Sequence, residues 1–360
     1  MTPRSLPSRS APRRFRARAI TASVAILVCG IAAVGCSASP PQHSEAVSPD
    51  TADTAANPES VRVTNLTVPG WASADEVSGA TEDEPNRTGS EKIPVRQYEP
   101  SGKPWAVLVW AHGGSFLAGD LDGPEPDWVA RQFAALGIRV YTVDYVLASD
   151  TVKAPAPAND VAAVLGWAGE QSELPLAVGG ASAGGQLAGY AALERNLAAR
   201  GQHSAASGHP GRGVARALLL EYPTLHRVQR EDPEVAALVK DLPDAKREDA
   251  DLVAQMYDYY LGPVSDADVA SKHLVMGELP AGTLRALPPT VIVNAEADDL
   301  RPSGEEFADQ LTSAGVRVAT SLQADTTHGY LSFPEDSPEA VTASTETMNT
   351  LAAGLRAIVE

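Results

Sequence analysis

The chain has 360 residues, enough for one large domain or two modest ones with a sizeable core. It carries 28 basic and 46 acidic residues, a net charge of −18, and this acidity argues against a protein that binds nucleic acid. Both cysteines, Cys29 and Cys36, lie near the N-terminus, so the rest of the chain excludes a disulfide framework, a cysteine nucleophile and a thiolate zinc site.

The first 36 residues have the pattern of an export signal. Six arginines and no acidic residue precede an uncharged apolar run at 19–35. A basic start followed by a short apolar run is typical of a secretory signal peptide, and this run is marginal for a spanning helix. It ends in AVGC, which resembles a bacterial lipobox with Cys36 as the acylated residue. We therefore expect an exported protein of the cell envelope, lipid-anchored to the outer face of a bacterial membrane. A secreted protein with a cleaved signal and an uncleaved anchor are the alternatives.

Residues 37–60 are rich in Ser, Pro, Ala, Thr and Asp and contain no aromatic residue, Leu or Ile. Such a segment cannot bury enough apolar surface to fold, so we expect a disordered tether. His43 lies within it and is expected to have no function. The folded domain is expected at 61–360.

Between residues 61 and 360, strand-like and helix-like segments alternate. The expected strands are 61–68, 93–98, 105–111, 138–143, 176–179, 217–221, 290–294 and 316–322. The expected helices are 127–136, 159–170, 183–199, 304–314 and a last helix from residue 338. Continuous apolar runs such as WAVLVWA at 105–111 are typical of strands buried on both faces. The alternation predicts an α/β fold with a mostly parallel central sheet flanked by helices.

Residues 223–289 interrupt this alternation. They contain a short helical stretch at 232–240, with Pro233 in its first turn, and an aromatic cluster at 256–260. A segment inserted after a strand of the sheet stands where a lid over a site would be. We therefore interpret residues 223–289 as a cap or lid insertion.

The sequence GASAGG at 180–185 is the sharpest local motif. It follows the apolar strand LPLAV, precedes a helix, and contains the only G-x-S-x-G string in the chain. Small residues at its ends suit a tight strand-to-helix turn, because a side chain there would strike the neighbouring strand or helix. Such a turn exposes the hydroxyl of Ser182 above the sheet and makes it a candidate nucleophile. The alternative is a glycine-rich helix start that Ser182 caps.

A second glycine motif, HGGSF at 112–116, follows the strand at 105–111. The amides of Gly113 and Gly114 are uncovered and can point at a developing oxyanion, and the amide of Ala183 would add a third donor. Removing one such donor typically costs about 2.7–4 kcal/mol of transition-state stabilisation. We expect the ring of His112 to support this loop rather than to transfer a proton.

A serine nucleophile needs a base, and the base needs an acid that orients it. Of the seven histidines, His328 follows the last strand, at the edge where a base can lean over Ser182. The acid should lie in the loop after the preceding strand. The pattern there does not decide between Asp298 and Asp299, and Glu296 is a further alternative.

The order of these motifs is that of the α/β-hydrolases. From about residue 93 to the C-terminus, the chain resembles the hormone-sensitive-lipase-like esterases, which share HGGG, DYRLAPE, GDSAGG and a DxLRD-type acid loop. The similar segments here are HGGSF, DYVLA at 144–148, GASAGG, LPPTVIVNAEADDLR and HGYLSFP. The resemblance implies an α/β-hydrolase fold, hydrolysis of carboxylic esters, and no metal or organic cofactor. It also implies a catalytic triad and an oxyanion hole, in which the family spacing favours Asp298 as the acid. The implied triad consists of Ser182, Asp298 and His328. The implied oxyanion donors are the amides of Gly113, Gly114 and Ala183.

The chain also departs from the family pattern. Ser115 replaces the third glycine, Ala181 replaces the acid before the nucleophile, and Pro302 stands where a second Asp is usual. Val146 and Ser149 replace the Arg and Pro of DYRLAPE. None of these changes removes a catalytic atom, but they alter the polar surroundings of the pocket, so the substrate preference of the family does not carry over.

The sequence thus predicts a serine esterase for short- to medium-chain acyl esters, with a small-molecule ester as its partner and no nucleic acid. The membrane is expected to be contacted only through the anchor at Cys36. Phe116, Tyr257 and Tyr260 are candidates for an apolar acyl pocket, with the lid core as the alternative. An amide or formamide hydrolase with the same triad, and a non-catalytic binding lipoprotein, are the alternative functions.

Overall fold

A computed structural model describes residues 58–70, 89–201, 213–243 and 246–360. Contacts divide the chain into two compact units, residues 1–52 and 53–360, and every described residue belongs to the second. The signal, the acylation site at Cys36 and the tether up to residue 57 lie outside the described residues, so they stay predictions. Pro58–Ser60 forms a short 3-10 turn. No described helix is long and apolar enough to cross a membrane.

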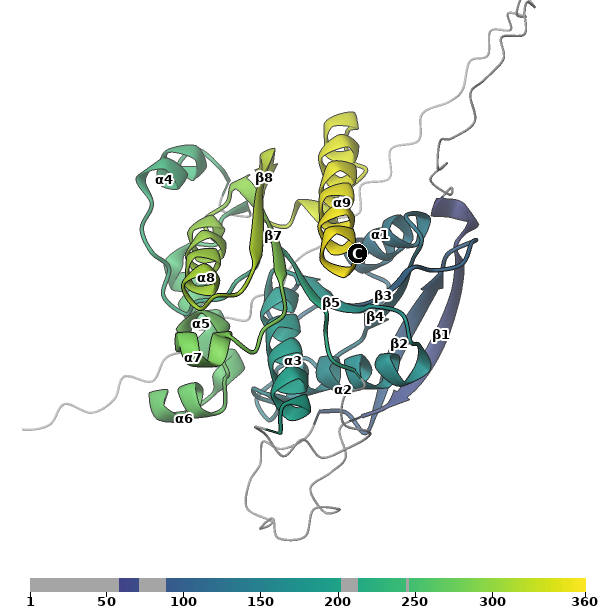
Figure 1. Ribbon diagram of the computed structural model, residues 1–360. Coiled ribbons are helices and arrows are strands. Elements are labelled where there is room, and N and C mark those ends of the chain that lie inside the picture. The colour runs from purple at the N-terminus through teal and green to yellow at the C-terminus, as the bar shows by residue number, and fades with distance from the viewer. Residues whose placement is uncertain (1–57, 71–88, 202–212, 244–245) are drawn as a thin grey trace, which may run out of the picture. The chain divides into compact units, whose positions relative to one another are not determined.

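The described strands form one eight-stranded sheet in the order β1-β2-β4-β3-β5-β6-β7-β8 (Figure 1). Their bounds are Arg62–Pro69 (β1), Lys92–Glu99 (β2), Ala106–Ala111 (β3), Ile138–Val143 (β4), Leu176–Ala181 (β5), Ala217–Glu221 (β6), Thr290–Ala297 (β7) and Val318–Thr327 (β8). The β1–β2 and β2–β4 pairs are antiparallel, and every other pair is parallel. The predicted α/β fold with a mostly parallel sheet is therefore confirmed.

Helices cover both faces of the sheet. The helices that pack on it are Pro124–Ala135 (α1), Ala156–Gln171 (α2), Ala183–Ala199 (α3), Arg301–Ser313 (α8) and Pro338–Val359 (α9). Helices α2, α3 and α8 share one hydrophobic cluster with the sheet, and α1 and α9 share the other (Figure 1). Neighbouring residues of β3 face opposite clusters, Val107 the first and Leu108 the second. The continuous apolar run of β3 reflects this burial on both faces.

Three helices begin three residues before their predicted starts, at Pro124, Ala156 and Arg301. Each carries a proline at its first or second position. Proline is tolerated there because its missing N–H has no acceptor within the helix, and its fixed φ already suits the first turn. The prolines in these first turns are not part of the apolar pattern from which the starts were predicted.

Strands β7 and β8 run beyond their predicted ends, to Ala297 and Thr327. The two strands pair in parallel up to Ala297 and Thr327, with an irregularity after Ala295. Because parallel strands present their carboxyl ends at the same edge of a sheet, Asp298 and His328 leave the sheet side by side. This extension positions two of the candidate site residues.

In its described residues, the inserted segment 223–289 forms helices joined by loops. It contains Pro233–Val239 (α4), Ala250–Leu261 (α5), Asp266–Ser271 (α6), Met276–Glu278 (η4) and Ala281–Leu284 (α7). Helix α5 contributes Val253, Met256, Tyr257 and Tyr260 to the cluster shared with α2, α3 and α8. This segment therefore packs on the same side of the sheet as those helices.

Candidate active site

Ser182 lies in the turn between β5 and α3 with φ of 52° and ψ of −121°, a strained conformation for a residue other than glycine. The turn has no room for side chains at its flanks. A Cβ on Gly180 would lie 2.4 Å from the backbone of Gly184, and one on Gly184 would lie 2.1 Å from the carbonyl oxygen of Ala111. The side chain of Ser182 makes no capping hydrogen bond to α3, which removes the helix-cap alternative.

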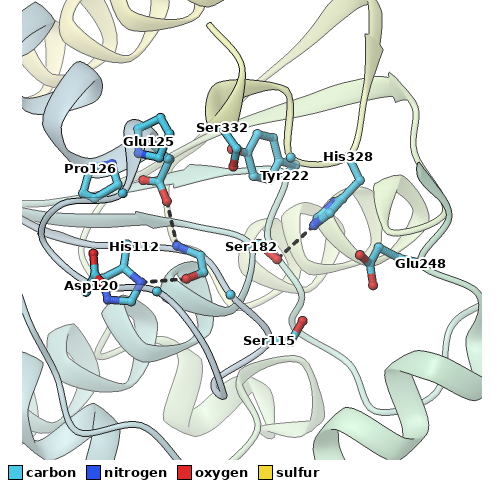
Figure 2. Close-up of a pocket in the computed structure, with 16 residues that line it drawn as sticks. His112, Ser115, Asp120, Glu125, Pro126, Ser182, Tyr222, Glu248, His328 and Ser332 are labelled. Carbon is cyan, nitrogen blue, oxygen red and sulfur yellow. Dashed lines mark hydrogen bonds between the residues drawn. The ribbon is translucent and has the colours of Figure 1, made fainter. Parts of the chain in front are cut away.

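The structure brings Ser182, Asp298 and His328 together. The Nε2 of His328 lies 2.9 Å from the Oγ of Ser182 (Figure 2), and its Nδ1 lies 2.9 Å from the Oδ2 of Asp298. The amide of Leu300 donates to the other carboxylate oxygen of Asp298 at 2.8 Å. Asp298 is 1% exposed, so this ion cannot rotate freely or exchange its partners for water. The ring of Tyr222 packs edge-on against His328 at 5.0 Å and fixes its plane.

The neighbouring acids have other partners. Asp299 accepts two hydrogen bonds from the guanidinium of Arg247, at 2.7 and 3.0 Å, and a third from the amide of Glu248. Glu296 accepts from the amide of Asp325 at 2.8 Å. The geometry thus distinguishes the acids between which the sequence did not decide. Asp298 contacts the histidine, and Asp299 connects the inserted segment to the end of β7.

The electrostatic surroundings of His328 favour its charged form. Burial lowers the pKa of His328, but the charge and hydrogen bond of Asp298, together with the negative charges of Glu248 and Asp299, outweigh it, so the pKa is raised above its ordinary value. A base must be neutral to accept a proton. Activity is therefore expected to rise with pH through this raised pKa and to be lost as His328 becomes protonated below it.

Substituting Glu248 with glutamine is expected to shift the acid limb of the kcat/KM profile to lower pH. The substitution removes one of the negative charges that raise the pKa of His328, so the ring stays neutral at lower pH. Below the wild-type midpoint the variant should be the more active enzyme on p-nitrophenyl acetate. The Glu248→Asp variant keeps the charge and should keep the midpoint. Identical midpoints for the wild type and Glu248→Gln would contradict this electrostatic effect.

The oxyanion loop differs from its prediction at Gly113. The amide of Gly113 donates to the Oε2 of Glu125 at 2.8 Å (Figure 2). An amide carries a single proton, so the structure contradicts the expectation that Gly113 supplies an oxyanion donor. The sequence could not reveal this because the acceptor comes from α1, twelve residues further along the chain.

The next two peptides are oriented by their carbonyl groups. The carbonyl oxygen of Gly113 lies 2.6 Å from the Nδ1 of His112, and that of Gly114 accepts from the amides of Leu117 and Ala118. In a trans peptide the N–H points opposite to the C=O, so the amides of Gly114 and Ser115 point away from these partners. Both residues line the cavity that contains Ser182.

Among the amides near Ser182 in the described part of the chain, those of Gly114, Ser115 and Ala183, the first residue of α3, donate to no acceptor. Gly114 adopts a φ of +121°, and a Cβ there would lie 2.0 Å from the carbonyl oxygen of Ala118, so glycine is required. Ser115 adopts a φ of 55°. Three free donors are therefore available to an oxyanion, with Ser115 in the place predicted for Gly113.

His112 lies beneath this loop. Its ring is 2% exposed and stacks on Tyr145 at 4.3 Å. Because the carbonyl oxygen of Gly113 can only accept, His112 carries its proton on Nδ1. Burial lowers the pKa of His112, which keeps the ring neutral. This arrangement fits the expected supporting role.

Glu125 is the site residue that the sequence analysis missed. Its side chain is buried and accepts from the indole Nε1 of Trp110 at 2.7 Å as well as from Gly113. Burial raises the pKa of Glu125 to about 7, although both hydrogen bonds work against this shift. The only signal in the sequence for Glu125 is that it is an acidic residue in the first turn of a helix. The helix is predicted from residue 127, so Glu125 lies outside the predicted helix.

The site opens into a cavity of about 290 Å³. The cavity is lined by Ser182, His328, the loop 112–115 and further residues, which Figure 2 shows as sticks. The acidic lining residues are Asp120, Glu125 and Glu248, and neither Lys nor Arg lines the cavity. Within the described ranges, no group of three or more His, Cys, Asp or Glu side chains is placed to hold a metal ion.

Phe116, Tyr257 and Tyr260 do not line this cavity. They pack on one another instead, with ring centroids 4.0 Å apart for Phe116 and Tyr260 and 5.5 Å apart for Phe116 and Tyr257. All three side chains are fully or almost fully buried. The structure contradicts the acyl-pocket expectation for these residues: they form the core between the oxyanion loop and α5, where burial of large aromatic surfaces stabilises the inserted segment.

Comparison with known proteins places this geometry in a family. A family described by its alpha/beta hydrolase fold matches residues 108–332. Carboxylesterase NlhH of Mycobacterium tuberculosis is 33% identical over 267 residues, covering 71% of this chain and 76% of the relative. Esterase LipI of the same species is 30% identical over 260 residues, covering 70% and 73%.

Solved structures agree with this result. A bacterial heroin esterase superposes with a TM-score of 0.61 and 28% identity, covering 83% of this chain and 86% of that one. The esterase of Pyrobaculum calidifontis superposes with a TM-score of 0.61 and 25% identity, covering 83% and 87%. The chain therefore belongs to the hormone-sensitive-lipase-like group of the α/β-hydrolase family and is a carboxylic ester hydrolase.

Proposed function

We propose that this protein is a serine esterase that hydrolyses short-chain acyl esters through an acyl-enzyme on Ser182. The observation that carries the proposal is the unbroken hydrogen-bond chain from the Oγ of Ser182 through His328 to the buried Asp298, with 2.9 Å at each step. A serine, a base within hydrogen-bond reach and an acid on the far side of the base are the parts that nucleophilic acyl transfer needs.

In the acylation step, the Oγ of Ser182 attacks the ester carbonyl carbon while the Nε2 of His328 takes the hydroxyl proton. The carboxylate of Asp298 holds the Nδ1–H and stabilises the imidazolium that forms. Negative charge develops on the carbonyl oxygen, which the free amides of Gly114, Ser115 and Ala183 stabilise. His328 then gives its proton to the leaving alcohol oxygen, the C–O bond breaks, and the acyl group remains on Ser182.

In the deacylation step, water replaces the alcohol. His328 takes a proton from the water as its oxygen attacks the acyl carbon, and the same amides stabilise the second tetrahedral intermediate. The bond to the Oγ of Ser182 breaks as His328 returns a proton to it. The acid product leaves, and the residues regain their starting protonation states.

The small cavity supports short acyl groups. Its volume of about 290 Å³ lies at the lower end of the range for ligand pockets. The aromatic side chains that would lengthen an apolar channel, Phe116 and Tyr260, are committed to the core instead. A long acyl chain would therefore have to lie outside the described cavity.

Initial rates on p-nitrophenyl acetate, butyrate and palmitate, with p-nitroacetanilide as the matched amide, test this proposal. We expect the acetate and butyrate esters to give the highest kcat/KM and the anilide to be hydrolysed much more slowly. Comparable turnover of the anilide would favour an amide hydrolase. A maximum at palmitate would contradict the short-chain preference while leaving the esterase activity intact.

A further inference from the structure

Glu125 is a buried carboxylate that the acyl-transfer steps do not use. It lies in the first turn of α1, is 5% exposed and lines the cavity around Ser182. Its two oxygens have different partners, the indole N–H of Trp110 at 2.7 Å and the amide N–H of Gly113 at 2.8 Å. Both partners are donors and neither can accept, so this site requires a group with two acceptor oxygens.

The contact at Gly113 belongs to a series that fixes the loop peptide by peptide. Tyr145 donates its hydroxyl to the carbonyl oxygen of His112 at 2.8 Å, and Glu125 holds the N–H at the other end of the same peptide. The next peptide is held at the carbonyl oxygen of Gly113 by His112. Gly113 is the hinge between these two peptides, and glycine rotates more freely than any other residue. Releasing its N–H would therefore loosen the adjoining amide of Gly114.

We propose that Glu125 is a positioning residue of the oxyanion hole: its carboxylate holds the N–H of Gly113 so that the amides of Gly114 and Ser115 remain directed at the developing oxyanion. The inference rests on the proposed function, since it presupposes an oxyanion at this place. Oxyanion donors act through pre-organised geometry, so a loosened loop should affect the transition state far more than the bound ester.

The two donors at this site suit a carboxylate that positions the loop better than they suit a group that only stabilises the fold. A buried charge is often no more stabilising than well-packed apolar residues of similar volume. A glutamine at residue 125 would have one acceptor oxygen for two donors, so its NH₂ group would face one of the two N–H donors and could not accept from it. An aspartate would keep both acceptor oxygens but would be one methylene shorter.

The test compares Glu125→Gln, Glu125→Asp and the wild type on p-nitrophenyl acetate. We expect Glu125→Gln to lower kcat by roughly 10- to 100-fold, somewhat less than the loss of a whole donor, with KM within about threefold of wild type. The inhibition constant of a short-chain trifluoromethyl ketone, which forms a tetrahedral oxyanion on the serine, should rise by a similar factor. Glu125→Asp should recover part of both losses.

Asp160→Asn is the matched control. Asp160 is equally buried and accepts from the backbone amides of Ser90 and Val146, at 2.6 and 2.9 Å, but it does not line the cavity. This variant should lose thermal stability while its kcat and the inhibition constant stay within about threefold of wild type.

Wild-type kcat and inhibition by the ketone in Glu125→Gln, with lost stability alone, would overturn the inference and leave the proposed function standing. A change confined to KM would also overturn it. If Glu125→Gln fails to fold, the Glu125→Asp variant alone tests the inference. A kcat below that of the wild type supports the inference, and a wild-type kcat contradicts it. A wild-type protein that hydrolyses no activated ester would overturn the proposed function and this inference together.

Discussion

Replacing Ser182 with alanine is expected to lower kcat for p-nitrophenyl acetate by about 10⁴- to 10⁶-fold. The alanine removes the hydroxyl oxygen that lies 2.9 Å from the Nε2 of His328, so no acyl-enzyme can form. Residual hydrolysis would come from water attacking an ester held near the free amides, and KM should change little. Initial-rate kinetics on purified protein measure both values.

Ser332→Ala is the control for this experiment. Ser332 also lines the cavity (Figure 2), but the hydrogen bonds of the His328 ring go to Ser182 and Asp298 and not to the hydroxyl of Ser332. This variant should retain a kcat within about threefold of wild type. A Ser182→Ala variant that kept more than about a tenth of the wild-type kcat would remove Ser182 from the role of nucleophile.

Asp298→Asn is expected to lower kcat by about 10⁴-fold, with the protein still folded. An asparagine can turn its NH₂ toward the Nδ1 of His328, which would place the ring proton on Nε2 and leave no base facing Ser182. It also removes the negative charge that stabilises the imidazolium. The pH–rate profile and kcat of the purified variant measure this effect.

Asp299→Asn provides the comparison that separates the two adjacent acids. It weakens the bidentate contact with Arg247 and should lower the melting temperature, while kcat stays within about tenfold of wild type. If Asp299→Asn lost more activity than Asp298→Asn, the assignment of the orienting acid would be reversed.

The sequence predicted the fold well because its signals were strong and local. Continuous apolar strands and a helix directly after GASAGG specify the buried sheet, and helix α3 begins and ends at the predicted residues, Ala183 and Ala199. The strand ends were less well predicted. The last residues of β7 and β8 include Glu296 and Asp325, whose polar side chains interrupt the apolar pattern although the backbone still pairs nearby.

The parts of the candidate site whose backbone is determined by a local motif were predicted from the sequence. The parts that depend on contacts with residues distant in the sequence were not. The tight turn at Ser182 follows from the glycines around it. The choice between Asp298 and Asp299 depends on where β7 ends, and the sequence placed that end three residues too early. The role of Gly113 depends on a carboxylate from α1, and no local pattern reveals which amide such a group will hold.

The aromatic residues show a similar limit. The cluster at 256–260 predicted burial, and the side chains of Tyr257 and Tyr260 are buried. Burial alone does not distinguish a substrate pocket from a packed core, because both place large apolar surfaces out of water. The direction of Phe116, which packs against α5, settled this point.

The most direct measurement is to map the residue that paraoxon modifies. This organophosphate ester transfers a diethylphosphoryl group to an activated serine and releases p-nitrophenolate. We expect about one equivalent of p-nitrophenolate for each protein chain, complete loss of esterase activity, and a diethylphosphoryl group on Ser182 by tandem mass spectrometry. A fully inhibited enzyme labelled at another residue, or an active esterase that paraoxon leaves unlabelled, would contradict the role of Ser182 as the nucleophile.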